Sequence, residues 1–364
     1  MFRKKHFSKG LSEFKYNLNR QSPLNAARRH WITFFKYNSW KKMYNLALIL
    51  TQFLLKRSNV KGYPFILKVE PTSRCNLRCP GCIAHGTDFP IEEGDMSLEL
   101  FKKLCDEMGD YLYKISLYIT GEPMLNRYIY DMIAYASKKR IGTVISTNFN
   151  FFNEEKAEKM IASGLSHIIV CLDGISQEVY GKYRVGGKVD NVLKNLDILT
   201  KKKIEMKSKN PFLEIQVINN EYNKDEIPKI HEFAKKLKAD RFTIREDLRE
   251  YKPAQRDRTC FWLWFTSLVT EKGVVLPCCA SAWWENDKKY FGDIKNNSFH
   301  EIWNSKKYIK AREVFRRRLE KSEENAIPTS LCSECTIFST QNTKALPFSD
   351  KTELSENTRN LYGK

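Results

Sequence analysis

The run Glu70-Pro-Thr-Ser-Arg-Cys-Asn-Leu-Arg-Cys-Pro-Gly-Cys82 places three cysteines, Cys75, Cys79 and Cys82, at the spacing C-x3-C-x2-C. Iron–sulfur clusters are normally held by four thiolates. A loop that supplies three thiolates leaves one iron of a four-iron cluster without a protein ligand, and metal chemistry occurs at such open positions. The chain has ten cysteines in 364 residues, so chance gives this spacing about 0.0075 times. The run therefore predicts a reactive metal-cluster site.

This spacing resembles the defining motif of the radical S-adenosylmethionine (radical SAM) superfamily. In that family the open iron chelates the amino and carboxylate groups of S-adenosylmethionine. An electron from the [4Fe-4S] cluster then cleaves the cofactor to a 5′-deoxyadenosyl radical, which abstracts a substrate hydrogen. The resemblance implies both cofactors and a radical enzyme. The alternatives are a structural zinc site or a redox thiol cluster, although zinc sites usually pair two C-x2-C elements.

A second motif, Thr120-Gly-Glu-Pro123, follows the apolar run 115–119, which predicts a strand ending in a turn. It resembles the GGEP element of the family, with Thr120 in place of the first glycine. The resemblance implies that Gly121, Glu122 and Pro123 bind the ammonium group of the cofactor's methionine.

A third polar turn, Ser146-Thr147-Asn148, follows the next apolar run. Polar groups at this family position hydrogen-bond the ribose of the cofactor, and the resemblance gives that role to these three residues. Taken alone, such a turn is more often a polar cap. The chain also departs from many family members at Gly81, where they carry an aromatic residue.

Strand and helix patterns alternate from the cysteine loop to about residue 245. Cap residues mark several helix ends, among them Ser97, Asn153 and a candidate capping box formed by Asn223 and Glu226. The predicted strands are 65–70, 113–119, 142–146, 167–172, 213–219 and 241–245, and the predicted helices are 97–108, 126–140, 154–163, 176–183, 189–203 and 225–238.

This alternation predicts an α/β fold with a parallel sheet and right-handed crossovers. Six repeats match the open, partial (β/α)6 TIM-like barrel of the superfamily. Functional residues of such folds gather at the carboxyl ends of the strands. Cys75, Glu122, Asn148 and Asp173 all follow predicted strands, so we expect them at one site.

Arg184 and Asp173 are the candidate catalytic residues. Arg184, within Tyr183-Arg-Val-Gly-Gly187, resembles a family position that faces cofactor or substrate, and the alternative is an ordinary surface arginine. No catalytic base is evident. Asp173, Tyr183 and His85 are candidates by location alone.

A second group of cysteines lies near the C-terminus. The pattern Cys260-x12-Gly273-x4-Cys278, followed by Cys332-x2-Cys335, resembles the SPASM module, in the shortened twitch form that holds one auxiliary [4Fe-4S] cluster. The resemblance makes these four cysteines its ligands and Lys272-Gly273 the turn that presents Cys278. Cys279 is the expected spectator, because successive strand side chains diverge, although exchange with Cys278 stays open. A four-cysteine zinc site is the alternative.

The two remaining cysteines, Cys105 and Cys171, stand among apolar residues and are predicted to be small buried hydrophobes. We find no secretory signal peptide, and the cluster chemistry is oxygen-sensitive. Both points predict a reducing cytoplasm rather than a disulfide framework.

The N-terminal extension differs from the core in composition. Residues 1–62 carry fourteen Lys or Arg and one acidic residue, Glu13, so they hold +13 of the formal net charge of +19. The apolar helix expected at 44–55 is too short to span a bilayer, which takes about 20 residues. Its basic flanks suit an anionic membrane surface. The alternative is a helix packed on the barrel, and no RNA-binding signature accompanies the charges, so nucleic acid is not an expected partner.

The sequence thus predicts four parts: a basic helical extension (1–62), a radical SAM core (63–250), an auxiliary-cluster module (251–340) and a flexible tail (341–364). We expect a cytoplasmic oxidoreductase, peripheral to the membrane, that draws electrons from a flavodoxin or ferredoxin. Its expected substrate is a sugar, a cyclitol or a lipid-linked glycan precursor. The alternatives are a peptide-modifying maturase and, in another class, a non-catalytic iron–sulfur or zinc redox sensor. No cobalamin-binding domain was found, which excludes methyltransferases that carry one.

Overall fold

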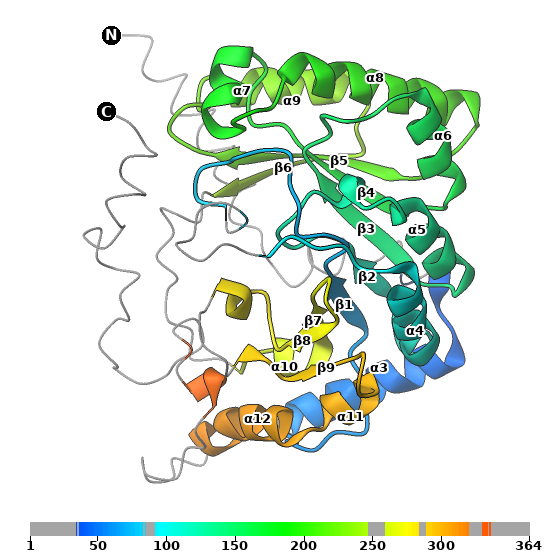
Figure 1. Ribbon diagram of the computed structural model, residues 1–364, viewed down its shortest axis with the longest axis vertical. Helices are drawn as coiled ribbons and strands as arrows, with labels where there is room; N and C mark the ends of the chain where they lie inside the picture. The colour runs from blue at the N-terminus through cyan, green and yellow to red at the C-terminus, as the bar shows by residue number, and fades with distance from the viewer. Residues whose placement is uncertain are drawn as a thin grey trace.

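The computed structural model describes residues 34, 36–82, 84, 92–246, 259–283, 289–319, 330–333 and 335 (Figure 1). Its strands are β1 (Ile66–Val69), β2 (Lys114–Ser116), β3 (Gly142–Thr147), β4 (His167–Cys171), β5 (Phe212–Asn219), β6 (Arg241–Glu246), β7 (Thr266–Val269), β8 (Val274–Leu276) and β9 (Gly292–Asp293). Its α-helices are α3 (Trp40–Leu54), α4 (Leu98–Met108), α5 (Ile129–Lys138), α6 (Glu154–Ala162), α7 (Gln177–Tyr183), α8 (Val189–Glu205), α9 (Ile227–Lys236), α10 (Trp262–Phe265), α11 (Phe299–Trp303) and α12 (Lys306–Leu319). Short 3-10 helices are η1 (Pro123–Leu125), η2 (Ala280–Trp283) and η5 (Leu331–Ser333).

The nine strands form one sheet in the order β6-β5-β4-β3-β2-β1-β7-β8-β9. The strands β1 to β6 pair in parallel, which confirms the predicted α/β barrel-like core. The strand β7 also pairs in parallel with β1, and β8 and β9 follow in antiparallel order. The sheet therefore runs without a break from the core into the C-terminal segment.

The two faces of the core sheet differ in chemistry. Figure 1 shows α4, α5, α6 and α8 along one side of the sheet. Strand residues buried against these helices are apolar, and they include Leu67, Ile115, Ile145, Val170 and Ile215. Residues that alternate with them point to the other face and are largely polar, including Lys68, Ser116, Ser146, Gln216 and Thr243. Because buried polar groups need partners, this inner face suits ligand binding better than packing.

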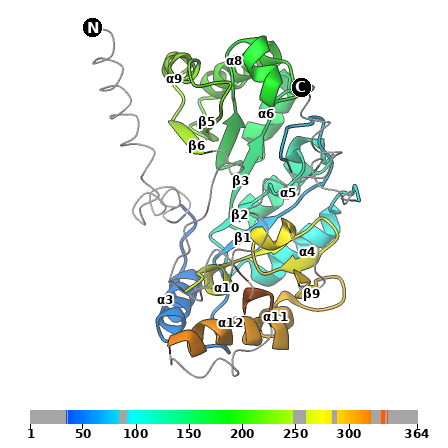
Figure 2. The same ribbon diagram turned by 90° about the vertical axis from the view of Figure 1, so that its left-hand side faces the viewer.

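The segment around α3 closes the end of the sheet where the parallel strands begin. Lys42 Nζ donates to the carbonyl of Arg140, just before β3, at 2.6 Å. Asn45 exchanges two hydrogen bonds of 2.9 and 2.8 Å with the backbone of Tyr63, just before β1. The helix expected at 44–55 is therefore present and lies on the barrel floor (Figure 2). No helix in the described part of the chain has the length and apolar character needed to cross a bilayer.

Local cap signals were mostly predicted well. Ser97 and Asn153 accept backbone hydrogen bonds at the starts of α4 and α6, as expected. The capping box at 223–226 was wrong, because no side chain caps α9. Instead, Asn223 Nδ2 donates to the carbonyl of Asp173 at 3.0 Å, and Glu226 accepts from the backbone of Ile175 at 2.7 Å. Both side chains are used to hold the turn after β4.

Candidate active site

The backbone that bears the cysteine loop is fastened to the Thr120–Pro123 turn. Glu122 N donates to the carbonyl of Arg74 at 2.8 Å. A Cβ atom at Gly121 would collide with the carbonyl oxygen of Thr72, so only glycine fits there. Asn126 Nδ2 donates to the carbonyl of Pro71 at 2.6 Å. The predicted cofactor turn and the cysteine loop thus form one packed unit.

The three cysteines of the loop are half-buried and unpaired. Burial raises the pKa of Cys75 to about 11, and Glu122, Cys79 and Cys82 add to that rise. Burial and Cys79 also raise the pKa of Cys82. Three free thiols on one loop can bind three irons of a four-iron cluster and leave the fourth iron without a protein ligand. The donor set therefore fits the expected [4Fe-4S] cluster.

Glu122 is buried at the floor of this unit. Its two carboxylate oxygens accept from the backbone nitrogens of Asn148 at 2.7 Å and Met124 at 3.1 Å. Burial raises its pKa, and these hydrogen bonds oppose the rise. A carboxylate has about four acceptor positions, so Glu122 keeps capacity for an ammonium group, the role that the resemblance implies.

The Ser146–Asn148 turn lies beside Glu122, as expected, but its side chains are partly used within the protein. Asn148 Nδ2 donates to Asn76 Oδ1 in the cysteine loop at 2.9 Å. Thr147 Oγ1 accepts from the backbone of Phe149 at 2.9 Å. Ser146 Oγ lies 3.5 Å from Cys171 Sγ. Asn148 thus holds the cysteine loop in place. Ser146 is the residue of this turn whose hydroxyl lies on the inner face of the sheet.

Arg184 and Asp173 form a buried ion pair against the cysteine loop. Arg184 Nε lies 2.5 Å from Asp173 Oδ2, and the two side chains are 12% and 0% exposed. Arg184 Nη1 donates to Cys79 Sγ at 3.7 Å. Burial would lower the pKa of the guanidinium, but Asp173 and nearby thiols raise it well above its usual value. Arg184 is therefore a fixed cation beside Cys79, and the surface-arginine alternative is wrong.

The positions of the other candidate bases and of the two isolated cysteines assign no catalytic role to them. Tyr183 is buried, with the Arg184 guanidinium 5.4 Å from its ring centroid. His85 lies outside the described residues. Cys105 belongs to the apolar core as predicted. Cys171 is buried too, but its neighbours are polar, since Gln216 Nε2 lies 4.0 Å from its sulfur on the inner face.

Sequence analysis missed a buried carboxyl contact next to the site. Glu70 accepts from the backbone nitrogen of Thr120 at 3.1 Å and also from its hydroxyl. Burial raises the pKa of Glu70 to about 8, with Thr120 opposing and Glu271 adding to the rise. Glu271 stands in the turn between β7 and β8. The threonine that replaces the family glycine therefore binds a carboxyl group that also contacts the C-terminal segment.

The four C-terminal cysteines predicted as cluster ligands come together. Burial, Cys260, Cys278 and Cys335 raise the pKa of Cys332 well above its usual value. Burial and two of the same thiols do so for Cys260, and the pKa of Cys278 rises to about 12. Gly273 has a φ of +85° in the β7–β8 turn that leads to Cys278. Cys279 influences Cys278 but is not among the thiols that shift Cys260 or Cys332.

Within the described ranges, no three His, Cys, Asp or Glu side chains meet at the spacing of a single metal ion. A four-iron cluster spreads its thiolates over different irons.

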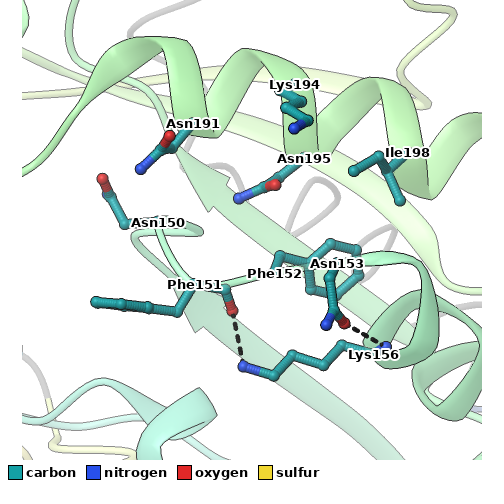
Figure 3. Close-up of a pocket in the computed structure, with 9 residues that line it drawn as sticks. All are labelled: Asn150, Phe151, Phe152, Asn153, Lys156, Asn191, Lys194, Asn195 and Ile198. Carbon is teal, nitrogen blue, oxygen red and sulfur yellow. Dashed lines mark hydrogen bonds between the residues drawn. The ribbon is translucent and has the colours of Figure 1, made fainter.

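A separate cavity of about 370 Å³ opens between the loop after β3 and the helix α8 (Figure 3). None of the predicted site residues lines it. Its nearest link to the site is Asn150, which donates to Asn148 Oδ1 through its backbone at 3.1 Å. The residues around it are Asn150, Phe151, Phe152, Asn153, Lys156, Asn191, Lys194, Asn195 and Ile198.

Two known protein families match the sequence of this chain, each over a different range of residues. Residues 69–241 match the radical SAM superfamily, and residues 260–336 match SPASM, an iron–sulfur cluster-binding domain. The chain belongs to the radical SAM superfamily and carries a C-terminal SPASM module. It therefore binds S-adenosylmethionine, the [4Fe-4S] cluster of the cysteine loop and auxiliary iron–sulfur centres.

Individual relatives agree with the fold. Fe-coproporphyrin III synthase of Methanosarcina barkeri is 36% identical over 126 residues, 34% of this chain and 31% of that protein. The AdoMet-dependent heme synthase of the same organism is 25% identical over 210 residues, covering 55% and 58% of the two chains. The chain thus spans only part of these relatives. The crystal structure of Streptococcus suis SuiB bound to S-adenosylmethionine superposes with a TM-score of 0.58 at 15% identity, over 86% of this chain and 79% of SuiB.

Proposed function

We propose that this radical SAM protein is an oxidoreductase that removes two electrons from a polar substrate. The observation that carries the proposal is the placement of two thiol groups on one continuous sheet. The cysteine loop follows β1, which is joined through β7 to β8. In the second group Cys260 precedes β7 and Cys278 follows β8, whereas Cys332 and Cys335 come after α12. When bound, the cofactors would supply the electron for cleavage and the hydrogen-abstracting radical at the first group.

The residues of the first group position the reactants. Cys75, Cys79 and Cys82 would hold the cluster, and Glu122 would hold the cofactor's ammonium. Arg184, fixed by Asp173 and aimed at Cys79, keeps a positive charge beside the thiolates whatever the pH of the solution. That charge favours the thiolate form and suits a carboxylate ligand of cofactor or substrate.

The second group would accept the electron that the substrate must lose. A carbon bearing a hydroxyl that gives up a hydrogen atom becomes a carbonyl by losing one proton and one electron. Four thiols, those of Cys260, Cys278, Cys332 and Cys335, would hold a single acceptor cluster, whose potential would be tuned by burial and by hydrogen bonds to sulfur. Asp173 is a positioning residue rather than the proton acceptor, because it is fully buried, with Oδ2 paired to Arg184 and Oδ1 accepting from the backbone of Ile218.

Sugars and cyclitols are the substrates we favour, because the inner face of the sheet is polar and includes Lys68, Gln216 and Thr243. Modification of a peptide is the second candidate. It is supported by similarity to the mycofactocin maturase MftC of Mycolicibacterium smegmatis, 28% identical over 142 residues. A flavodoxin or ferredoxin would be the electron donor in either case. A non-catalytic redox sensor has no use for Glu122.

The test is iron and sulfide per chain after anaerobic reconstitution, with 5′-deoxyadenosine formation as a second readout. We expect about eight irons in the wild type and about four in a Cys75/Cys79/Cys82→Ala variant, which forms no 5′-deoxyadenosine. A wild type with about four irons and a variant with none would remove the electron acceptor from the proposal. Iron binding without cofactor cleavage would favour the sensor.

A further inference from the structure

The outward face of α3 is apolar along its whole length. Trp40, Met43, Tyr44, Leu50 and Leu54 lie at helical spacing on one side, and we call them the α3 stripe. Their side chains are exposed, Trp40 at 76% and Leu54 at 74%. A contiguous exposed apolar stripe of this kind marks an interaction surface rather than ordinary scatter of single residues.

The inward face of the same helix is mixed. Lys42 and Asn45 are each 3% exposed, and both are satisfied by the backbone at the strand starts. Ile49 is fully buried in the apolar core, and the ring of Phe53 packs against that of Trp264. An amphipathic helix on a water-facing surface places its apolar side inward and its polar side outward. Because α3 already packs on the barrel through Ile49 and Phe53, its outward stripe is additional apolar surface and suits an apolar surrounding.

The segment that contains the stripe carries charges of one sign. Residues 34–62 contain no Asp or Glu, and residues 1–33 contain eight basic residues against one acidic residue. Lys41, at the first turn of α3, is exposed and pairs with Asp110 on the sheet side. The basic residues of 34–62 are Lys36, Lys41, Lys42, Lys56, Arg57 and Lys61. A partner with a negatively charged surface and an apolar interior complements this pattern.

We propose that the α3 stripe lies in the surface of an anionic lipid bilayer. The leucines would enter the acyl boundary, Trp40 and Tyr44 would sit at headgroup depth, and the lysines would face the anionic headgroups. The inference is independent of the reaction that the protein catalyses.

The position of α3 also sets the orientation on the membrane. The helix touches the segments that enter β1, β2 and β3, whereas the cysteine loop lies past the other end of β1. A bilayer on α3 would therefore face the barrel floor, and the site would open toward water. A substrate whose reactive group stays at the bilayer surface would then lie on the side of the barrel opposite the cysteine loop.

The test is co-sedimentation of the full reconstituted chain with vesicles of phosphatidylcholine containing about 30% phosphatidylglycerol. We expect the wild type to bind and a Leu50→Gln/Leu54→Gln variant to lose at least about tenfold in the partition constant. The matched control is Ile204→Gln on α8, where an apolar side chain is also exposed, at 77%, and it should bind as the wild type does. Equal iron content in all three chains checks folding.

Three outcomes would overturn the proposal. If the wild-type protein stays in the supernatant, it does not bind the anionic vesicles and the proposal is wrong. Binding that is unchanged in the double variant belongs to basic residues outside α3. Self-association without vesicles that the double variant abolishes assigns the stripe to a second copy. As an independent readout, brominated lipid should quench part of the tryptophan emission in the wild type and less in Trp40→Phe.

Discussion

The two thiol groups are built in opposite ways. Cys75, Cys79 and Cys82 come from one loop of eight residues, and charged side chains lie around them. The four C-terminal cysteines come from three segments, and Cys260 and Cys335 are 75 positions apart. The pKa values of Cys260, Cys278 and Cys332 are raised by burial and by neighbouring thiols, with no charged residue among the main causes.

This difference separates a reactive site from a closed one. A local loop keeps its shape with or without metal, and it can leave a coordination position open beside Arg184 and Glu122. An assembled group uses all of its ligands and joins distant parts of the chain, as structural metal sites do. The first group is expected to control activity and the second to control both stability and electron transfer.

The largest expected change in the free energy of unfolding comes from removing the charge of Arg184 beside the first group. Arg184→Met leaves Asp173 buried without its partner, and breaking such a pair costs about 3–5 kcal/mol. The free energy of unfolding, from anaerobic denaturant titration, is the measurement. Lys182→Met is the matched control, because its pair with Glu178 is exposed and should contribute less than about 0.5 kcal/mol.

A double variant, Arg184→Met/Asp173→Asn, refines that result. Removing both charges should restore part of the lost stability, because no unpaired charge then stays buried. If the double variant is as unstable as the sum of the two single variants, the pair is not coupled and Arg184 stabilises the fold only through packing.

The next effect compares the two groups directly. A cluster closing the 75-residue loop restricts the unfolded chain by about 4.5 kcal/mol, whereas one closing the eight-residue loop does so by about 2.5 kcal/mol, treating the cluster as a cross-link. Cys260→Ala/Cys335→Ala should therefore cost about 2 kcal/mol more than Cys75→Ala/Cys82→Ala, while only the second pair abolishes cofactor cleavage. Equal losses of stability would contradict the difference in construction.

A third effect lies at the contact between the two regions. The folded-state pKa of Glu70 is raised to about 8 from 4.5, so the folded protein binds its proton more tightly and loses stability as pH rises between these values. Glu70→Gln cannot ionise and keeps an acceptor for Thr120. Between pH 6 and pH 8 the wild type should lose about 1–2 kcal/mol more than the variant. Parallel pH profiles would mean that Glu70 is ionised throughout.

The parallel core sheet of six strand–helix repeats could be predicted from the sequence, because each strand is a short apolar run with a turn at its end, whereas the addition of β7, β8 and β9 to its edge could not. The cysteine loop could be predicted because its ligands are local. The position of α3 could not, since the structure buries Lys42 and Asn45 beside Ile49 and leaves most of the apolar residues of this helix exposed.

Contacts between residues far apart in the sequence could not be predicted from sequence patterns either. The pair formed by Arg184 and Asp173 joins residues 11 positions apart, but its contact with Cys79 depends on how three loops meet. Asn223 and Glu226 had the spacing of a capping box, yet tertiary contacts with the turn after β4 replaced it. The contact between Glu70 and Glu271 needed the pairing of β1 with β7, which no local pattern signals.

The smallest expected effect decides between two adjacent thiols. Cys278 is one of the thiols that shift the pKa values of Cys260 and Cys332, whereas Cys279 acts on Cys278 alone among these shifts. Cys279→Ala should therefore keep the full iron content and change the free energy of unfolding by less than about 0.5 kcal/mol. Cys278→Ala, the matched control, should lose the auxiliary iron, about four atoms per chain. If the two variants behave in the reverse order, the turn at Gly273 presents the second thiol of the pair, and the side chain of Cys278 must point away from the cluster.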